Sequence, residues 1–115
     1  MATVVVLTER AERQLKKLDR CDRTARRLLT QDLEALENEP PPGNIDLQSL
    51  TGYPPWQRLR QGNWRAALFP VTRDELAEAG YDADRGFVVY LVLSKQDFKK
   101  AARRLPKSIA TPSSR

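Results

Sequence analysis

Gly62 and Asn63 separate two segments of alternating polar and apolar side chains, residues 56–61 and 64–69. A two-residue loop of this composition between alternating segments is typical of a β-hairpin. The loop also sets the register, because each residue before the turn then has one partner after it. The predicted pairs are Gln61 with Trp64, Arg60 with Arg65, and Arg58 with Ala67. The chain is therefore expected to contain an antiparallel sheet that includes this hairpin.

The predicted register gives the hairpin a basic face and an apolar face, since paired residues share a face and side chains alternate along each strand. The basic face carries Arg58, Arg60 and Arg65. The apolar face carries Leu59, Trp64, Ala66 and Leu68. Like charges opposite each other destabilise a sheet. The basic face is therefore expected to bind a polyanion, a nucleic-acid phosphate backbone first of all, with a merely solvated charged face as the alternative.

Basic charge is concentrated in the hairpin and the C-terminal segment. The 115 residues carry a net charge of +5, and residues 1–39 balance eight basic against eight acidic side chains. Residues 87–115, by contrast, carry seven basic side chains and one acidic one, while residues 71–86 are acidic. This distribution favours an anionic partner through long-range attraction.

The chain has no histidine and one cysteine, Cys21. These counts exclude a Ser-His-Asp triad, a histidine-paired cysteine and a paired-histidine ribonuclease mechanism. They also remove the usual zinc ligands, so neither a metal site nor a small-molecule cofactor is expected. A lone cysteine fits a reducing compartment. No apolar run approaches the roughly 20 residues that cross a bilayer, and none resembles a signal peptide. We therefore expect a cytoplasmic protein with no membrane partner.

The N-terminal part of the chain is predicted to form one strand and two helices. Residues 3–7 form a β-branched run typical of a buried strand. Thr8 and Asp22 are good N-caps, and each precedes apolar residues at helical spacing. Residues 40–43, Pro-Pro-Pro-Gly, are expected to end the second helix.

The C-terminal part is predicted to complete an α+β domain of order β-α-α-β-β-β plus a short C-terminal helix. Residues 87–93 form the most apolar strand, typical of a central position in the sheet. Residues 72–86 are expected to be an exposed connection, and a basic helix is expected between Lys95 and Pro106. Residues 1–107 are predicted to be a single domain, followed by a disordered tail at 108–115. In this fold, two N-terminal helices pack on an antiparallel sheet.

Four features of residues 3–105 resemble the RelE/ParE toxin superfamily of bacterial toxin–antitoxin systems. They are the 8–18 helix after a first strand, the Leu50–Gly52 segment, the hairpin Arg58-Leu-Arg-Gln-Gly-Asn-Trp-Arg65, and an apolar strand ending near Ser94-Lys95. The hairpin is the most specific feature, because an Arg-x-Arg turn followed by an aromatic residue and arginine marks these toxins.

The resemblance implies a microbial-ribonuclease-like fold and an endoribonuclease, an mRNA interferase that stops translation by cutting messenger RNA in the ribosomal A site. It also implies a cognate antitoxin that wraps and neutralises the toxin. The family's catalytic and RNA-binding set corresponds here to Arg58, Arg60, Arg65 and Lys95. The basic C-terminal helix and an aromatic residue that could stack on a base extend the RNA-binding set to Lys99, Lys100, Arg103 and Trp56.

Metal-independent RNA cleavage proceeds by attack of a 2′-hydroxyl on the adjacent phosphorus. The arginines would stabilise the charge that develops on the phosphate oxygens. Lys95 is the candidate proton donor or acceptor, and its role as a base requires burial among the arginines. RelE members carry a tyrosine in the C-terminal helix, or a histidine in other branches, whereas here that region reads Phe98–Ala102 and Tyr90 lies in a strand. The acid–base assignment is therefore open.

Two other functions fit the same sequence: a ParE-like inhibitor of DNA gyrase, and an inactive module that still binds an antitoxin. The antitoxin is expected to bind by strand addition or as a helix in a groove, with acidic residues over the arginines. Trp64 is expected in the core because its face is apolar, whereas Trp56 is as easily a core residue as a base-stacking one.

Overall fold

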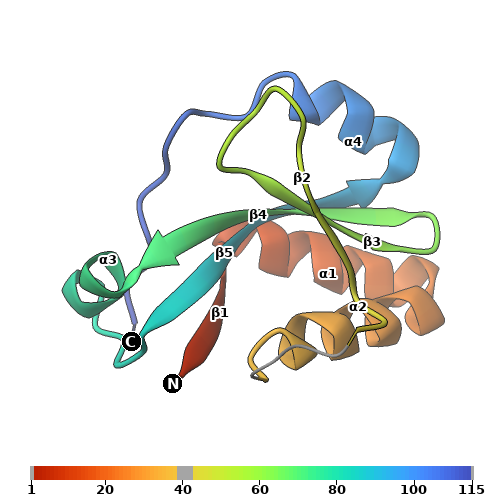
Figure 1. Ribbon diagram of the computed structural model, residues 1–115. Coiled ribbons are helices and arrows are strands. Elements are labelled where there is room, and N and C mark those ends of the chain that lie inside the picture. Colours follow the sequence, from red (N-terminus) through yellow and green to blue (C-terminus); the bar gives the residue numbers. More distant parts are fainter. Residues whose placement is uncertain (1, 39–42, 115) are drawn as a thin grey trace.

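The computed structural model describes residues 2–38 and 43–114. Five strands and four helices follow each other along these residues (Figure 1). They are β1 (Thr3–Leu7), α1 (Glu9–Cys21), α2 (Arg23–Ala35), β2 (Asp46–Ser49), β3 (Gln57–Gln61), β4 (Trp64–Thr72), α3 (Arg73–Glu78), β5 (Arg85–Ser94) and α4 (Lys95–Ala102). The predicted α+β class and the predicted order of its main elements are confirmed. None of the described helices is long and apolar enough to cross a membrane.

The strands form one sheet in the order β1-β5-β4-β3-β2. The most apolar strand, β5, lies inside the sheet between β1 and β4, as its sequence predicts. The expectation of a purely antiparallel sheet is wrong at one pairing, because β1 runs parallel to β5 with Val6 opposite Val88. The other three pairings are antiparallel.

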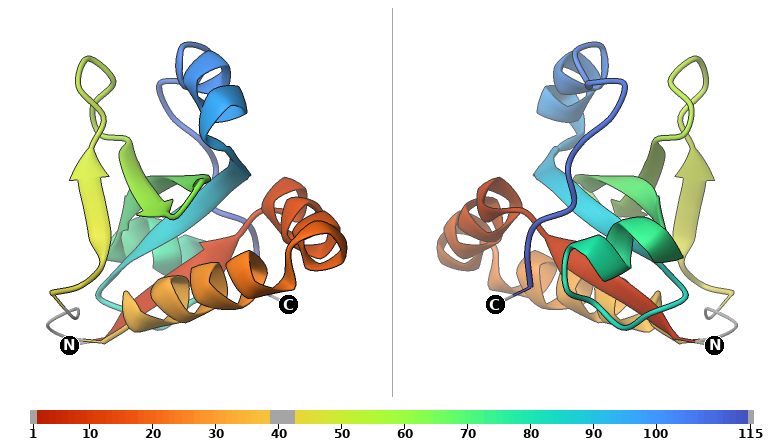
Figure 2. Two further views of the ribbon diagram at one scale, coloured as in Figure 1. Left: turned by 90° about the vertical axis from the view of Figure 1, so that its right-hand side faces the viewer. Right: turned by 90° about the vertical axis from the view of Figure 1, so that its left-hand side faces the viewer.

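Helices α1 and α2 cover one face of the sheet (Figure 2). Thr8 caps α1 by accepting a hydrogen bond from the Ala11 N–H, and Asp22 caps α2 by accepting one from the Ala25 N–H, as predicted. The apolar side chains of both helices meet the hairpin on this face, where Leu59 and Leu68 are fully buried. Helix α2 ends at Ala35, and all but the last residue of the predicted stop at residues 40–43 lie outside the described residues.

Helix α4 packs on the opposite face, over β4 and β5. Ser94 caps it by accepting a hydrogen bond from the Asp97 N–H, and Phe98 is its buried anchor. The same cluster includes Leu76 of α3 and Val88 of β5. Helix α4 covers only part of this face. The side of the hairpin that carries the arginines lies beside α4 and is not covered by it.

Two elements are missing from the sequence prediction. Residues 73–78, expected in an exposed connection, form α3, which begins with a capping box between Thr72 and Glu75 and buries Leu76. Residues 46–49 form the edge strand β2, a short polar segment whose pairing with β3 decides its conformation. Neither element has a long periodic pattern, so tertiary contacts determine both.

Residues 108–114, expected to be disordered, follow a defined path back toward α3 (Figure 1). Ile109 packs against the apolar cluster under α4, and the Ser114 N–H donates a hydrogen bond of 2.8 Å to the Ala79 carbonyl. The domain boundary at residue 107 and the disorder of the tail at 108–115 stay predictions.

Candidate functional site

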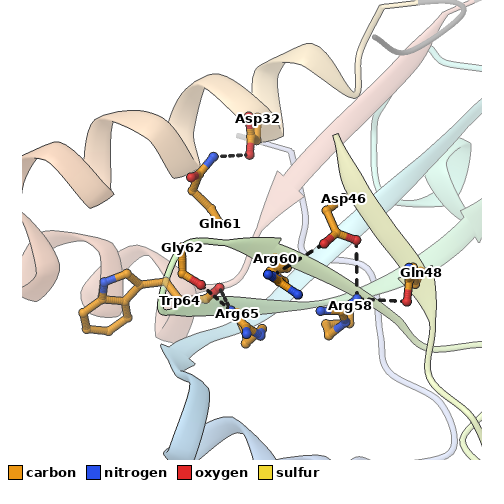
Figure 3. Close-up of polar contacts among 9 residues, drawn as sticks. All are labelled: Asp32, Asp46, Gln48, Arg58, Arg60, Gln61, Gly62, Trp64 and Arg65. Atoms are coloured by element: carbon orange, nitrogen blue, oxygen red, sulfur yellow. Dashed lines mark hydrogen bonds and ion pairs between the residues drawn. The ribbon is translucent and has the colours of Figure 1, made fainter. Parts of the chain in front are cut away.

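The hairpin register is confirmed pair by pair: Gln61 lies opposite Trp64, Arg60 opposite Arg65, and Arg58 opposite Ala67. Gly62 has a φ of +56°, which suits the first loop position of a type II′ turn. The three arginines share the face away from α1 and α2 (Figure 3). Leu59, Trp64, Ala66 and Leu68 pack on the other side, as predicted.

Arg65 is buried, with 6% of its surface exposed. Its Nη1 donates hydrogen bonds of 2.8 Å to the Gly62 carbonyl and 2.9 Å to the Trp64 carbonyl. The Arg65 side chain therefore stabilises the hairpin turn through hydrogen bonds to its backbone. A guanidinium has five N–H donors, so the Nη2 and Nε donors of Arg65 keep the capacity to bind an anion.

Asp46, on the edge strand β2, neutralises part of the arginine face (Figure 3). Its Oδ1 lies 3.4 Å from Nη2 of Arg58, and its Oδ2 lies 3.7 Å from Nε of Arg60. Arg58 Nη2 also donates a hydrogen bond of 3.0 Å to Oε1 of Gln48. The repulsion among the arginines is thus partly balanced within the chain, so the cluster depends less on a polyanion than its sequence predicts.

The local charge is nevertheless still unbalanced around Arg65. Burial lowers the pKa of the Arg65 guanidinium, and the positive charges of Arg60 and Arg58 lower it further, while Asp46 acts in the opposite direction. An anion placed against Arg65 would relieve this repulsion, because it would add the missing negative charge. The electrostatics of the cluster therefore favour an anionic ligand.

Arg60 is the most accessible member of the cluster. The exposed fraction of its side chain is 56%, against 19% for Arg58, and among the described residues its ion-pair partner is Asp46. Arg58 is held by both Asp46 and Gln48, and Arg65 by the turn. The cluster therefore combines two arginines of fixed position with one that can reach an incoming phosphate.

The structure brings Lys95 to the hairpin turn. Its N–H donates a hydrogen bond of 2.9 Å to the Asn63 carbonyl, and the preceding Ser94 lies opposite Trp64. The Lys95 side chain is exposed. The burial on which a general-base role depended is therefore missing, although the position beside the turn is as expected.

Helix α4 distributes the predicted RNA-binding residues over two flanks. Lys95, Lys99 and Arg103 recur every four residues and share one flank, because residues four apart lie above one another. Lys100 is on the other flank, where it lines a hollow beside β5 and α1. The first flank therefore begins beside the hairpin turn at Lys95, whereas Lys100 lies on the flank that borders the hollow.

Trp56 does not lie on the binding surface, and its predicted role in base stacking is wrong. It is 2% exposed, and its Nε1–H donates a hydrogen bond of 2.7 Å to the Pro106 carbonyl. Its ring meets the rings of Phe69 and Tyr90 edge-on, with centroids 5.0 and 5.3 Å away. Trp56 is thus a core residue between the hairpin and the segment after α4.

The hairpin is also attached to the helix layer. Gln61 Nε2 donates a hydrogen bond of 2.7 Å to Oδ2 of Asp32 on α2 (Figure 3). Trp64 is half-buried and packs against the α1–α2 cluster, as its apolar face predicts. In the described part of the chain, no group of three or more cysteine, aspartate or glutamate side chains could hold a metal ion.

Comparison with known proteins identifies the fold. One chain of the crystal structure of the RelB–RelE antitoxin–toxin complex from Methanococcus jannaschii superposes with a TM-score of 0.58. The superposition covers 84% of this chain and 96% of the other, at 18% sequence identity. The protein has a RelE-like fold. No protein-family model matches the chain, and no curated protein matches it significantly.

The RelE-like fold confirms the architecture implied by the sequence resemblance. At 18% identity the similarity concerns the path of the backbone, so the roles of individual residues rest on the geometry of this chain. In this RelE-like sheet, β3 and β4 carry the arginine cluster, and the start of α4 lies beside their turn.

Proposed function

We propose that this protein is the toxin of a toxin–antitoxin pair and acts in the cytoplasm as a metal-independent endoribonuclease on messenger RNA, in the ribosomal A site. The observation that carries the proposal is the grouping of Arg58, Arg60 and Arg65 on one face of a RelE-like sheet, with Arg65 buried and fixed. Guanidiniums held in place bind two phosphate oxygens at once and need little reorganisation during the reaction.

In the proposed reaction, the 2′-oxygen of one nucleotide forms a bond to the adjacent phosphorus, and the bond from phosphorus to the 5′-oxygen breaks. Arg60 and Arg58 bind the phosphate oxygens, and the free donors of Arg65 stabilise the charge that develops on them. Lys95 donates a proton to the leaving 5′-oxygen, because a solvated lysine ammonium is a proton donor rather than a base. The proton of the 2′-hydroxyl passes to water at the exposed side of the cluster.

The proposed partner is an antitoxin with acidic residues that cover the arginine face. The structural neighbour comes from an antitoxin–toxin complex, and the basic face of this chain suits an acidic segment. The complex should weaken as salt is raised and after the charge reversals Arg58→Glu or Arg65→Glu. An affinity indifferent to salt and to both reversals would rule out this mode of neutralisation.

Cleavage is best tested with Arg60→Ala, because Arg60 is exposed and does not hold the turn, whereas Arg65→Ala would also remove the hydrogen bonds that close it. A brief pulse of the protein in cells, followed by primer extension on a reporter messenger RNA, should give discrete cuts that depend on translation. The cuts should become about 10²- to 10³-fold rarer with Arg60→Ala. Arg13→Ala is the matched control, since Arg13 is an exposed α1 arginine paired with Glu9.

The chemistry itself can be checked on the fragments. Attack by the 2′-hydroxyl leaves fragments with a 2′,3′-cyclic phosphate and a 5′-hydroxyl. Cleavage should continue in the presence of a metal chelator, and it should stop when the 2′-oxygen of the RNA is methylated. Intact transcripts together with growth arrest and a DNA-damage response would contradict the nuclease function and support inhibition of DNA gyrase instead. Intact transcripts without arrest would leave a module that binds an antitoxin only.

A further inference from the structure

A second basic site lies on the flank of α4 that carries Lys100. A hollow of about 410 Å³ opens between α4, β5 and the first turn of α1. Three cations line it, Arg10 from α1 and Lys100 and Arg104 from α4, around the ring of Tyr90. Leu91, Ala101 and Leu105 form its apolar wall. The volume is within the range of small-ligand sites, about 300–1,000 Å³.

Tyr90 is placed in this hollow by an irregularity of the sheet. Ala67 lies opposite Leu91 and Leu68 opposite Val89, so Tyr90 is the extra residue of a β-bulge. A bulge re-aims the side chain of the extra residue. The Tyr90 ring rests against Trp56 on one side, and no hydrogen bond joins its hydroxyl to any residue in the described part of the chain.

The cations around Tyr90 are not neutralised. Among residues 2–38 and 43–114, no carboxylate lies within 4 Å of the charged nitrogens of Arg10, Lys100 or Arg104, although Asp97 also lines the hollow. The Arg10 guanidinium lies over the Tyr90 ring, 5.6 Å from its centroid. This cation–π contact orients Arg10 at the rim. The arginine cluster has Asp46 as an internal counter-charge, whereas no described carboxylate forms an ion pair with the cations of this site.

We propose that the hollow binds a phosphodiester group of RNA outside the cleavage site, with Arg10, Lys100 and Arg104 on the phosphate oxygens and the Tyr90 hydroxyl as a further donor. The proposal rests on RNA being the substrate of the proposed function. Three unneutralised cations and a hydroxyl match the several acceptor oxygens of a phosphate. The apolar wall suits the sugar and base attached to that phosphate, which an acidic peptide side chain would leave uncovered. Helix α4 would then lie between two phosphates of the bound RNA.

The test measures binding of a single-stranded 2′-O-methyl RNA 15-mer, which cannot be cleaved, by fluorescence anisotropy at several salt concentrations. The double substitution Lys100→Gln/Arg104→Gln should weaken binding about tenfold or more, since hydrogen bonds to charged groups are lost. The slope of affinity against salt should fall by about one, the change expected for one phosphate contact. Tyr90→Phe, which keeps the ring, should weaken binding about fivefold.

Lys16→Gln/Arg20→Gln is the matched control, because it removes the same charge from exposed positions on α1. If this control weakens binding as much as Lys100→Gln/Arg104→Gln does, the effect is one of net charge and the proposal fails. If Arg60→Ala weakens binding, whereas Lys100→Gln/Arg104→Gln weakens binding neither to the 15-mer nor to small ribosomal subunits, the second site fails while the proposed function stands. If the unaltered protein does not bind the 15-mer or ribosomal subunits, the proposed function fails first.

Two further binding measurements identify the molecule that supplies the phosphate. If Lys100→Gln/Arg104→Gln weakens binding to purified small ribosomal subunits but not to the 15-mer, the result supports the phosphodiester site and assigns the phosphate to ribosomal RNA. A polyglutamate peptide should compete poorly for the hollow. If the peptide binding instead depends on Lys100 and Arg104 while RNA binding does not, the site is one for an acidic protein segment and the proposal is overturned.

Discussion

Removal of the Asp46 carboxylate should improve RNA binding and weaken the fold at the same time. Asp46 is the shared partner of Arg58 and Arg60, at 3.4 and 3.7 Å. Substitution Asp46→Asn keeps the shape of the side chain but abolishes its charge. Both guanidiniums are then freed for phosphate, while their mutual repulsion, and the repulsion from Arg65, is no longer offset.

The magnitude follows from the exposure of the two pairs. Partly exposed ion pairs contribute about 0.2–1 kcal/mol each, so two pairs correspond to roughly 0.4–2 kcal/mol. At 1.4 kcal/mol per factor of ten, affinity for RNA should rise by a factor of about 2 to 30. The free energy of unfolding should fall by a similar amount, because the same interactions are lost from the folded state.

The assay is anisotropy with the 2′-O-methyl 15-mer, paired with urea unfolding of the same preparations. Asp82→Asn is the matched control, since it raises the net charge by the same unit at an exposed position in the loop before β5. Tighter binding with Asp46→Asn than with Asp82→Asn would show that the gain is local. Equal or weaker binding by a folded Asp46→Asn protein would refute the view that Asp46 competes with phosphate for the arginines.

Three substitutions test the fold that positions the site, each by urea unfolding. Trp56→Phe should cost about 1–3 kcal/mol, since the Pro106 carbonyl loses its donor. Gly86→Ala should cost about 1–3 kcal/mol, because the added methyl group would collide with the Val4 carbonyl oxygen across the β1–β5 pairing. Thr72→Ala should cost about 0.5–2 kcal/mol by removing the α3 capping box, and amide exchange should accelerate in the first turn of α3. Stabilities unchanged within about 0.3 kcal/mol would contradict the corresponding contact.

The hairpin was predictable because its determinants are local. A turn of glycine and asparagine sets which residues pair, and alternation sets which face each side chain takes. The predicted pairing of Arg60 with Arg65 and the apolar face of Leu59 and Trp64 needed no knowledge of the rest of the chain. The capped starts of α1 and α2 were predictable for the same reason.

What could not be predicted depends on which segments meet in three dimensions. Asp46 lies in a short polar stretch with no strand signal, so its position opposite Arg60 appears only once β2 is in place. The burial of Arg65 follows from the closure of the turn over its guanidinium. Trp56 was ambiguous because its partner, the Pro106 carbonyl, lies 50 residues further along the chain.

The parallel pairing of β1 with β5 has a consequence for synthesis of the protein. Thr3 pairs with Arg85 and Leu7 with Val89, so the first strand emerges from the ribosome long before its partner. The hairpin can close as soon as residues 57–72 are available, but its arginine face lacks the flanking α4 until residue 102 is made. Non-local pairings of this kind form late and leave apolar surface exposed meanwhile. A nascent chain thus remains open to chaperones and proteases until α4 has been made, and the arginine face gains its flanking helix last.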